Sequence, residues 1–257
     1  MDVVERSRHI GGAGPTAGDW ARDAALAAVS TIELDELIPP GARVVVVAPH
    51  PDDEILTCGA LLHLVAARGD APLIVAVTDG EASHPGSPAW SPQRLREART
   101  NETNTALACL GIDAGRVRRL AIPDGGVTGA AALLERQLAA IIAPGDVVIT
   151  TWRFDGHPDH ESTALACANV VRHCGARLLQ APVWGWHWSA PGDGAMPLAQ
   201  ARKLPAPPAS LMRKRAALGC FHSQIEGDAS SGAAPILPAF AMERVLHPFE
   251  LYFTDHA

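Results

Sequence analysis

The stretch that decides the fold runs from Val44 to Gly59 and reads VVVVAPHPDDEILTCG. Its four consecutive valines predict a strand that is buried on both faces, as in a parallel sheet. The acids that follow, with apolar residues at helical spacing from Ile55 onward, predict a sharp turn and then a helix. A buried strand that delivers an imidazole and carboxylates at its carboxyl end commonly builds the site of an open α/β sheet.

Outward from this stretch, apolar strands alternate with helices along the chain. Strands are predicted at 44–48, 73–78, 117–121, 146–151 and 177–183, and helices at 53–68, 92–110, 128–142, 161–174 and 210–219. The alternation predicts an α/β fold: a single-domain, Rossmann-like, mostly parallel sheet flanked by helices. An irregular excursion rich in Trp, Pro and Gly is expected at 184–208, and a strand or edge hairpin at 243–253. No GxGxxG follows the first strand, which argues against a dinucleotide site.

Length and charge narrow the class of protein. The 257 residues, 47% of them hydrophobic, are enough for one sizeable core. We expect a weakly structured N-terminal extension at 1–40 and one main domain at 41–257. The net charge of -7 gives no reason to expect nucleic acid as a partner.

The same composition bears on location. No apolar run is long enough to span a bilayer, so no membrane span is expected. The first residues lack the basic start and apolar stretch of a signal peptide, so we expect a cytoplasmic protein. Arginine far outnumbers lysine, as in bacterial genes of high GC content.

Two short motifs carry the chemistry: HPDDE at 50–54 and HPDHE at 157–161. Each places a histidine and a second metal-ligating residue three positions apart where a helix can begin. Both follow predicted strands, so in a parallel sheet they lie at the same edge. Two imidazoles and a carboxylate that converge there suit zinc and leave room for water. One such histidine alone has roughly even odds of being a cap or turn residue, but two clusters weaken that alternative.

These motifs resemble the LmbE-like (PIG-L) family of zinc-dependent N-acetylglucosaminyl deacetylases. APHPDDE at 48–54 and HPDH at 157–160 carry the resemblance. The family pattern R-x-x-E-x-x-x-A-x-x-x-L-G is matched from Arg99 to Gly111, and a family aspartate by Asp124. A lysine-to-SQ signature matches Lys214 through Ser223-Gln224, so the resemblance covers about residues 43–226.

The resemblance implies a metal site and a base. His50, Asp53 and His160 would bind one Zn²⁺ per chain, with other divalent metals left open. Asp52 would act as the general base toward the attacking water.

The resemblance also implies further catalytic and substrate-binding residues. His157 would stabilise the oxyanion and protonate the leaving amine, and Asp159 would orient His157. Arg99 and Asp124 would bind substrate hydroxyls. For Arg99 the alternative is an i,i+3 pair with Glu102 on a solvated helix face.

One residue departs from the family pattern. Some relatives place a tyrosine just before the second motif, whereas the only tyrosine here is Tyr252 and Asp155 stands two residues before His157. Oxyanion stabilisation is therefore expected from zinc and His157, and the role of Asp155 is left open.

A tryptophan cluster, WGWHW at 184–188, is the second distinctive feature. Trp186 and Trp188 are predicted to bind substrate as an aromatic platform for a sugar or an acyl chain. The equally weighted alternative is a clamp that packs this segment onto the core.

Together these features predict a metal-dependent hydrolase that removes the N-acetyl group from an N-acetylglucosamine-type amino-sugar conjugate, using zinc-activated water. A zinc hydrolase of another amide or ester is the first alternative, and a non-catalytic sugar- or metabolite-binding protein the second. Asp52 beside the ligand set argues against the second, because a binding protein needs no base there. The sequence does not indicate the acceptor part of the substrate. It also leaves open whether the protein is a monomer or a homo-oligomer.

Overall fold

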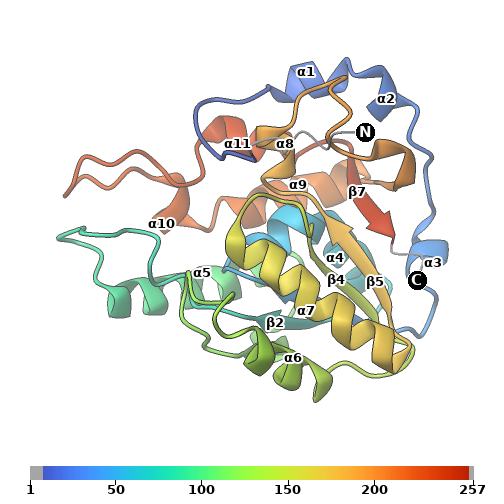
Figure 1. Cartoon of the computed structure of the whole chain (residues 1–257), viewed down its shortest axis with the longest axis horizontal. Helices are drawn as coiled ribbons and strands as arrows, with labels where there is room; N and C mark the ends of the chain where they lie inside the picture. The colour runs from blue at the N-terminus through green and yellow to red at the C-terminus, as the bar shows by residue number, and fades with distance from the viewer. Residues whose placement is uncertain (1–7, 255–257) are drawn as a thin grey trace.

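A mostly parallel sheet forms the centre of the molecule and confirms the predicted α/β fold (Figure 1). The computed structural model describes residues 8–254. Its strands are β1 Val44–Ala48, β2 Leu73–Ala76, β3 Val117–Arg119, β4 Val147–Thr151, β5 Arg177–Ala181, β6 Ala201–Pro205 and β7 Phe249–Thr254. They lie in the order β3-β2-β1-β4-β5-β7-β6. The first five are parallel, and β7 runs antiparallel to both its neighbours. Since the strand order reverses beside β1, a crevice opens between the carboxyl ends of β1 and β4.

The valine run of β1 is buried along its whole length, as predicted. Val44 and Val46 pack into the core on one face of the sheet, and Val45 and Val47 into the core on the other. Burying each of these side chains is worth ~1.5–3 kcal/mol. This strand therefore ties the two layers of helices together and fixes where the first motif emerges.

Helices cover both faces of the sheet. The long ones are α4 Asp53–Ala67, α5 Pro92–Cys109, α6 Ala131–Ala139, α7 Pro158–Cys174 and α9 Pro208–Leu218. Shorter ones are α1 Ala17–Ala21, α2 Ala24–Ala27, α3 Leu34–Leu37, η1 Ala114–Arg116, α8 Gly185–Trp188, η2 Leu198–Gln200, α10 His222–Ile225 and α11 Ala239–Arg244. Helices α6 and α7 contribute to the core on one face, and α4, α5 and α9 to the core on the other. Among residues 8–254, no helix is long and apolar enough to cross a membrane.

Helix starts decide where the motifs point. Ser91 caps α5 as its sequence suggests, accepting from the Arg94 N–H at 3.2 Å. Thr128 does not cap α6, which begins at Ala131. Helix α7 begins earlier than predicted, because His157 caps it with proline at the first helical position. The second motif therefore lies on the first turn of α7 rather than in a loop before it.

The segment 184–208 is more regular than predicted, and the tail forms the predicted strand over a shorter range. The segment contains α8, η2 and the strand β6, and the tail forms α11 and then β7, which lies inside the sheet. The sequence of β6, ARKLP, has two basic residues and a proline, which are typical of an edge strand. They interrupt the apolar pattern by which a strand is recognised in a sequence.

The N-terminal segment is folded onto the core rather than weakly structured, over the residues described. Trp20 is buried and its Nε1 donates to the backbone oxygen of Trp186 at 2.9 Å. The Ile32 N–H donates to Lys203 O, and the Lys203 N–H to Ser30 O. Residues 30–32 therefore cover the outer edge of β6.

Helix α4 is broken near its middle, at Cys58 with φ -144° and ψ 26°. The N–H groups of Ala60 and Leu61 are freed there and donate to the Glu250 carboxylate of β7 at 2.8 and 2.9 Å. Lys214 Nζ of α9 bonds to Glu250 Oε1 at 2.7 Å and to a freed backbone oxygen at 3.0 Å. The hydroxyl of Tyr252 donates to Glu250 Oε2 at 2.8 Å. We call Lys214, Glu250 and Tyr252 the Lys214–Glu250 network.

Candidate metal centre

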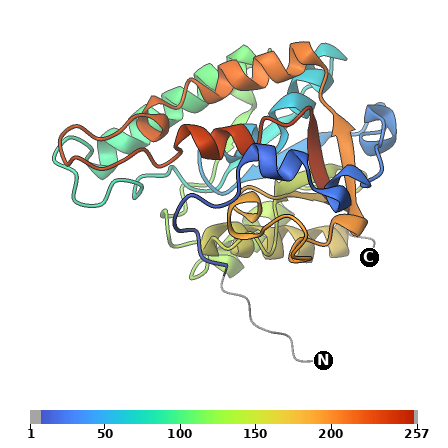
Figure 2. The same cartoon turned by 90° about the horizontal axis from the view of Figure 1, so that it is seen from above.

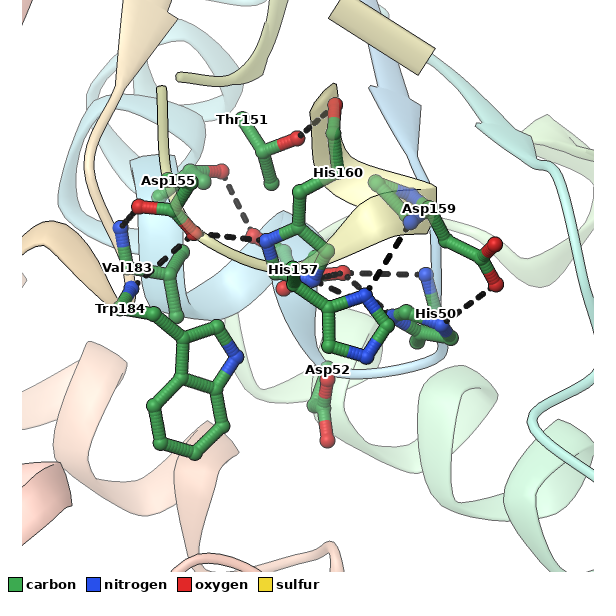
Figure 3. A network of polar contacts seen from close by, with 12 residues as sticks. His50, Asp52, Thr151, Asp155, His157, Asp159, His160, Val183 and Trp184 are labelled. Carbon is green, nitrogen blue, oxygen red and sulfur yellow. Dashed lines mark hydrogen bonds and ion pairs between the residues drawn. The ribbon is translucent and has the colours of Figure 1, made fainter. Parts of the chain in front are cut away.

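The two motifs meet at the crevice between β1 and β4 (Figure 3). His50 follows β1, Asp53 begins α4 and His160 lies in the first turn of α7. His50 Nδ1 is 3.3 Å from Asp53 Oδ2 and 3.2 Å from His160 Nε2. His160 Nε2 is 3.2 Å from Asp53 Oδ2. We call these three residues the metal centre, since their ligand atoms form a nearly equilateral triangle.

The triangle has the dimensions of a zinc site. Two ligand atoms at ~2.0–2.1 Å from a tetrahedral zinc ion lie about 3.3–3.4 Å from each other. The nitrogen and carboxylate donors are also the types that zinc prefers. The described residues therefore fit this ion.

The second nitrogen of each histidine faces a carboxylate. His50 Nε2 lies 3.2 Å from Asp124 Oδ1 and 3.3 Å from Asp159 Oδ2. His160 Nδ1 lies 2.7 Å from Asp155 Oδ2. A carboxylate holds the ring proton on the nitrogen that faces it and leaves the other nitrogen free as a ligand. Two imidazole lone pairs and the Asp53 carboxylate then face one point, which calls for a cation.

Ionisation of the centre agrees with this geometry. Burial lowers the pKa of His160, but the carboxylates of Asp53 and Asp155 outweigh it and raise that pKa to about 9. Burial raises the pKa of Asp53, but His160 and His50 hold it well below its usual range. Both shifts reflect the close approach of carboxylates and imidazoles, which favours positive charge on the rings and negative charge on Asp53.

Two other groups of possible ligands overlap this centre. Ligand atoms of His50, His157 and His160 lie within 4.8 Å of one another, as do those of His50, Asp124 and Asp159. In the first group, His157 Nδ1 already accepts the Asp159 N–H that caps α7. In the second, both carboxylates lie on the side of His50 that carries the proton. We therefore favour the triangle that includes Asp53.

Asp52 lies beside the centre in a strained backbone conformation. Its φ is 123° and it stands at the N-cap of α4. Such a conformation costs ~1–3 kcal/mol and persists only where neighbours enforce it. Its N–H donates to Glu54 Oε2 at 3.0 Å, and Arg99 Nη2 donates to its carboxylate at 3.1 Å. Burial raises the pKa of Asp52 to about 7 against the opposing effect of Arg99, a value suited to a general base at neutral pH.

Arg99 is buried, so a solvated pair with Glu102 is the wrong interpretation. Besides Asp52, its guanidinium donates to Pro51 O at 2.6 Å and to Gly80 O at 3.0 Å. Glu102 instead accepts from the N–H and hydroxyl of Ser223. Arg99 therefore holds the turn of the first motif, although it also lines the cavity described below.

Asp159 takes a role different from the predicted one. Its carboxylate accepts from the N–H groups of Gly125 and Val127 at 2.8 and 3.2 Å and faces His50. It therefore orients His50, whereas only its backbone N–H reaches His157. Burial lowers the pKa of His157 to about 4, with His160 and His50 adding to the effect. His157 is thus neutral at neutral pH.

Asp155 is the residue that sequence reasoning noticed but to which it could give no role. It is fully buried, and its carboxylate accepts from the N–H groups of Val183, Trp184 and Gly185 at 2.8–3.0 Å as well as facing His160 (Figure 3). The departure from the family tyrosine marked this position as unusual. Its partners lie about 30 residues further along the chain, where no spacing rule connects them to it.

Trp186 and Trp188 pack against other aromatic rings, as the clamp alternative predicts, and neither lines the cavity described below. Trp186 packs edge-to-face on Trp20, with ring centroids 5.2 Å apart. Trp188 stacks on Trp152 and its Nε1 donates to the Asp155 backbone oxygen at 2.9 Å. Trp184 is the member of this cluster that lines the cavity.

A cavity of about 300 Å³ opens over the centre. Its wall includes the predicted ligands, Asp52, Arg99, Asp124 and His157. Asp124 accepts from the Ala82 N–H at 2.9 Å, which ties it to the loop after β2. Every predicted site residue except Trp186, Trp188 and Asp159 lines this cavity. Asp159 does not reach the cavity wall but contacts His50 from behind.

Comparisons with known proteins agree with this geometry. Residues 45–171 match the protein-family model described as PIG-L: GlcNAc-PI de-N-acetylase. Over 181 residues the chain is 30% identical to the 1D-myo-inositol 2-acetamido-2-deoxy-alpha-D-glucopyranoside deacetylase of Mycolicibacterium gilvum (strain PYR-GCK). That alignment covers 60% of this chain and 61% of that protein, so the chain spans about three fifths of this relative's length.

Solved structures share the fold. The zinc inhibited form of teicoplanin deacetylase Orf2 is similar with a TM-score of 0.59 at 21% identity, over 72% of this chain and 85% of that one. The conserved protein TT1542 from Thermus thermophilus is similar with a TM-score of 0.53 at 26% identity, over 72% of this chain and 80% of that one.

Proposed function

Since residues 45–171 match the PIG-L family model, we propose that the chain is a metal-dependent hydrolase of an N-acetylated amino sugar. The bond broken would be the amide between acetyl and the sugar nitrogen of an N-acetylglucosamine-type conjugate. The observation that carries the proposal is the triangle of His50, Asp53 and His160 with a buried carboxylate beside it. A relative named as a deacetylase of such a conjugate supports it.

His50, Asp53 and His160 would hold one zinc ion, which when bound lowers the pKa of a water molecule and polarises a carbonyl. Asp52 accepts the proton of the attacking water, because burial gives its carboxylate a pKa of about 7. Arg99 keeps Asp52 in place by bonding to its carboxylate and to the backbone of the turn.

His157 supplies a hydrogen-bond donor on the other side. Its Nδ1 accepts the Asp159 N–H, so in the neutral ring the proton lies on Nε2. An Nε2–H group can donate to the carbonyl oxygen as negative charge develops on it. The low pKa of His157 means that it reaches the reaction as a neutral donor.

Acetate release and metal content test the proposal together. Purified protein should contain about one zinc per chain and release acetate from N-acetylglucosaminides, and chelation should abolish the release until zinc is restored. Zinc-loaded protein that binds these sugars without releasing acetate would favour the non-catalytic alternative. Release of other acyl groups, from amides or esters but not from N-acetyl sugars, would favour another zinc hydrolase.

Two expectations stay predictions: a cytoplasmic location and the division into 1–40 and 41–257. The described part of the N-terminal segment supports treating it as a structural cover for β6 and α8.

A further inference from the structure

The wall of the cavity changes character away from the metal centre. Among the residues described, its charged side chains all belong to the centre or its immediate partners. The rest of the wall has four large apolar side chains, Leu56, Trp184, Ile236 and Leu237. It also has two uncharged polar side chains, Ser83 and Gln224, and the small residues Ala82 and Gly125.

These polar side chains are largely engaged within the protein. Ser83 Oγ lies 2.9 Å from His84 Nδ1. Gln224 Nε2 donates to Ser223 Oγ at 2.9 Å, and that hydroxyl donates to Glu102 at 2.7 Å. Few polar groups therefore remain there to bind the many hydroxyls of a polyol.

Two loops contribute this wall. Residues 77–91 connect β2 to α5, residues 226–238 connect α10 to α11, and the two project side by side from one side of the molecule (Figure 2). Their tips touch, since Ser230 Oγ accepts from the Ala89 N–H at 3.2 Å. Neither loop contains a lysine or an arginine. Phosphate groups are generally recognised by such cations, so this wall lacks the residues to bind one.

Ile236 stands out within the second loop. It is 38% exposed although it lines the cavity, whereas its neighbour Leu237 is 5% exposed. An apolar ligand that covered Ile236 and lay along Leu56 and Trp184 would remove apolar surface from water, which is favourable.

We propose that the sugar's aglycone is apolar, an alkyl or aryl group, and that Ile236, Leu237 and Trp184 select it. This inference rests on the proposed function, because it concerns the group attached to the deacetylated sugar. It distinguishes this chain from the relative whose name specifies an inositol conjugate.

A matched series of glycosides tests the proposal on the zinc-loaded full chain. We would measure kcat/KM for acetate release from methyl, butyl and hexyl N-acetylglucosaminides, the inositol conjugate and N-acetylglucosamine 1-phosphate. Each methylene that becomes fully buried is worth about threefold to fourfold, so hexyl should exceed methyl by at least ~10-fold. The inositol and phosphate compounds should do no better than methyl.

Variants assign the effect to the wall. Ile236→Ser should lower the hexyl-to-methyl ratio by ~5-fold, and Ile236→Ala by less. Leu165→Ser, at a leucine 58% exposed on α7, should leave the ratio unchanged. Equal kcat/KM for methyl and hexyl, or a clear preference for inositol, would overturn the proposal while leaving deacetylation intact. A failure to release acetate from any of these glycosides would instead overturn the proposed function.

Discussion

Two buried polar clusters lie along the same helix, α4, and they differ in how their charge is compensated. At its N-terminus stands the metal centre of His50, Asp53 and His160. At its break stands the Lys214–Glu250 network. In the network one ammonium faces one carboxylate, and both Glu250 oxygens have donors from the protein. In the centre, two imidazole lone pairs and a carboxylate face one another.

The difference separates structural charge from functional charge. Buried charge is costly unless it is paired and hydrogen-bonded, and the network meets both conditions. The centre meets them by itself only while its imidazoles hold extra protons, and it needs a cation from outside the chain once both ring nitrogens act as ligands. A buried polar group that the protein satisfies by itself supports the fold, whereas a converging set of ligands without a protein cation indicates a binding site.

The largest expected effect lies at the centre, in Asp52→Asn. The amide cannot accept a proton, so kcat for acetate release should fall ~10²–10⁴-fold. Zinc content and the free energy of unfolding should stay close to wild type, because the substituted side chain keeps an oxygen for Arg99. Near-full activity of this variant would remove Asp52 from the mechanism.

A comparable effect, on stability instead of activity, is expected from Lys214→Met. Removing one partner leaves the Glu250 carboxylate buried without its cation, which typically costs ~3–5 kcal/mol of unfolding free energy. The other lysine of the chain, Lys203, provides the control, since it lies partly exposed on β6. Urea denaturation should show Lys203→Met within about 1 kcal/mol of wild type. Equal decreases in the free energy of unfolding for the two variants would show that the network does not stabilise the fold.

Acid should lower the free energy of unfolding through His247, a buried histidine whose pKa is affected by Lys214 of the network. Burial lowers the pKa of His247 to about 4, with Lys214 and Lys203 adding to the effect. Between pH 6.5 and 4 the unfolded chain binds a proton at this residue that the folded chain does not. Its contribution to stability is therefore present above pH 6.5 and lost as the pH falls, by up to about 3 kcal/mol.

His247→Phe should remove this part of the pH dependence, since phenylalanine has no proton to bind. Denaturation curves at pH 4.5 and 7 measure it, with His222→Phe, at an exposed histidine on α10, as the control. The same slope against pH in wild type and His247→Phe would contradict the prediction.

The smallest effect is expected from Asp155→Asn, at the carboxylate that faces the second ring nitrogen of His160. In the wild type, carboxylate oxygens of Asp155 face both His160 Nδ1 and the backbone N–H groups. In the variant, the amide NH₂ replaces one of these oxygens and so points a donor at a group that needs an acceptor. Losing this orienting carboxylate should weaken zinc affinity by ~10–100-fold. Competition with a chromogenic chelator measures the loss, and Asp113→Asn at an exposed aspartate serves as the control. Unchanged zinc affinity would show that Asp155 merely anchors the segment after β5.

Sequence was informative where the pattern is local. The valine run, the helix that follows it and the limits of α5 could be predicted within a residue or two, because burial and capping act between near neighbours. The two motifs could be brought to one edge because parallel strands share their carboxyl ends.

Sequence failed where partners are distant. Asp155 acts through backbone groups of 183–185, which carry no side-chain pattern to detect. The tryptophans at 186 and 188 resemble a ligand platform in composition, and only Trp20 and Trp152 decide that they pack. For 243–253 the sequence left a strand and an edge hairpin open, because nothing local there indicates that β7 has two neighbours in the sheet.

The position of β7 has a consequence for synthesis on the ribosome. Chains emerge N-terminus first, so β1 to β5 can pair while later residues are still being added. Strand β6 has to wait, because β7 separates it from β5. The N–H groups of Ala60 and Leu61 likewise wait for Glu250, about 190 residues later. A nascent chain arrested before β7 would therefore hold both His-Pro-Asp motifs and still lack the strand that joins β6 to the sheet and supplies the acceptors at the break in α4.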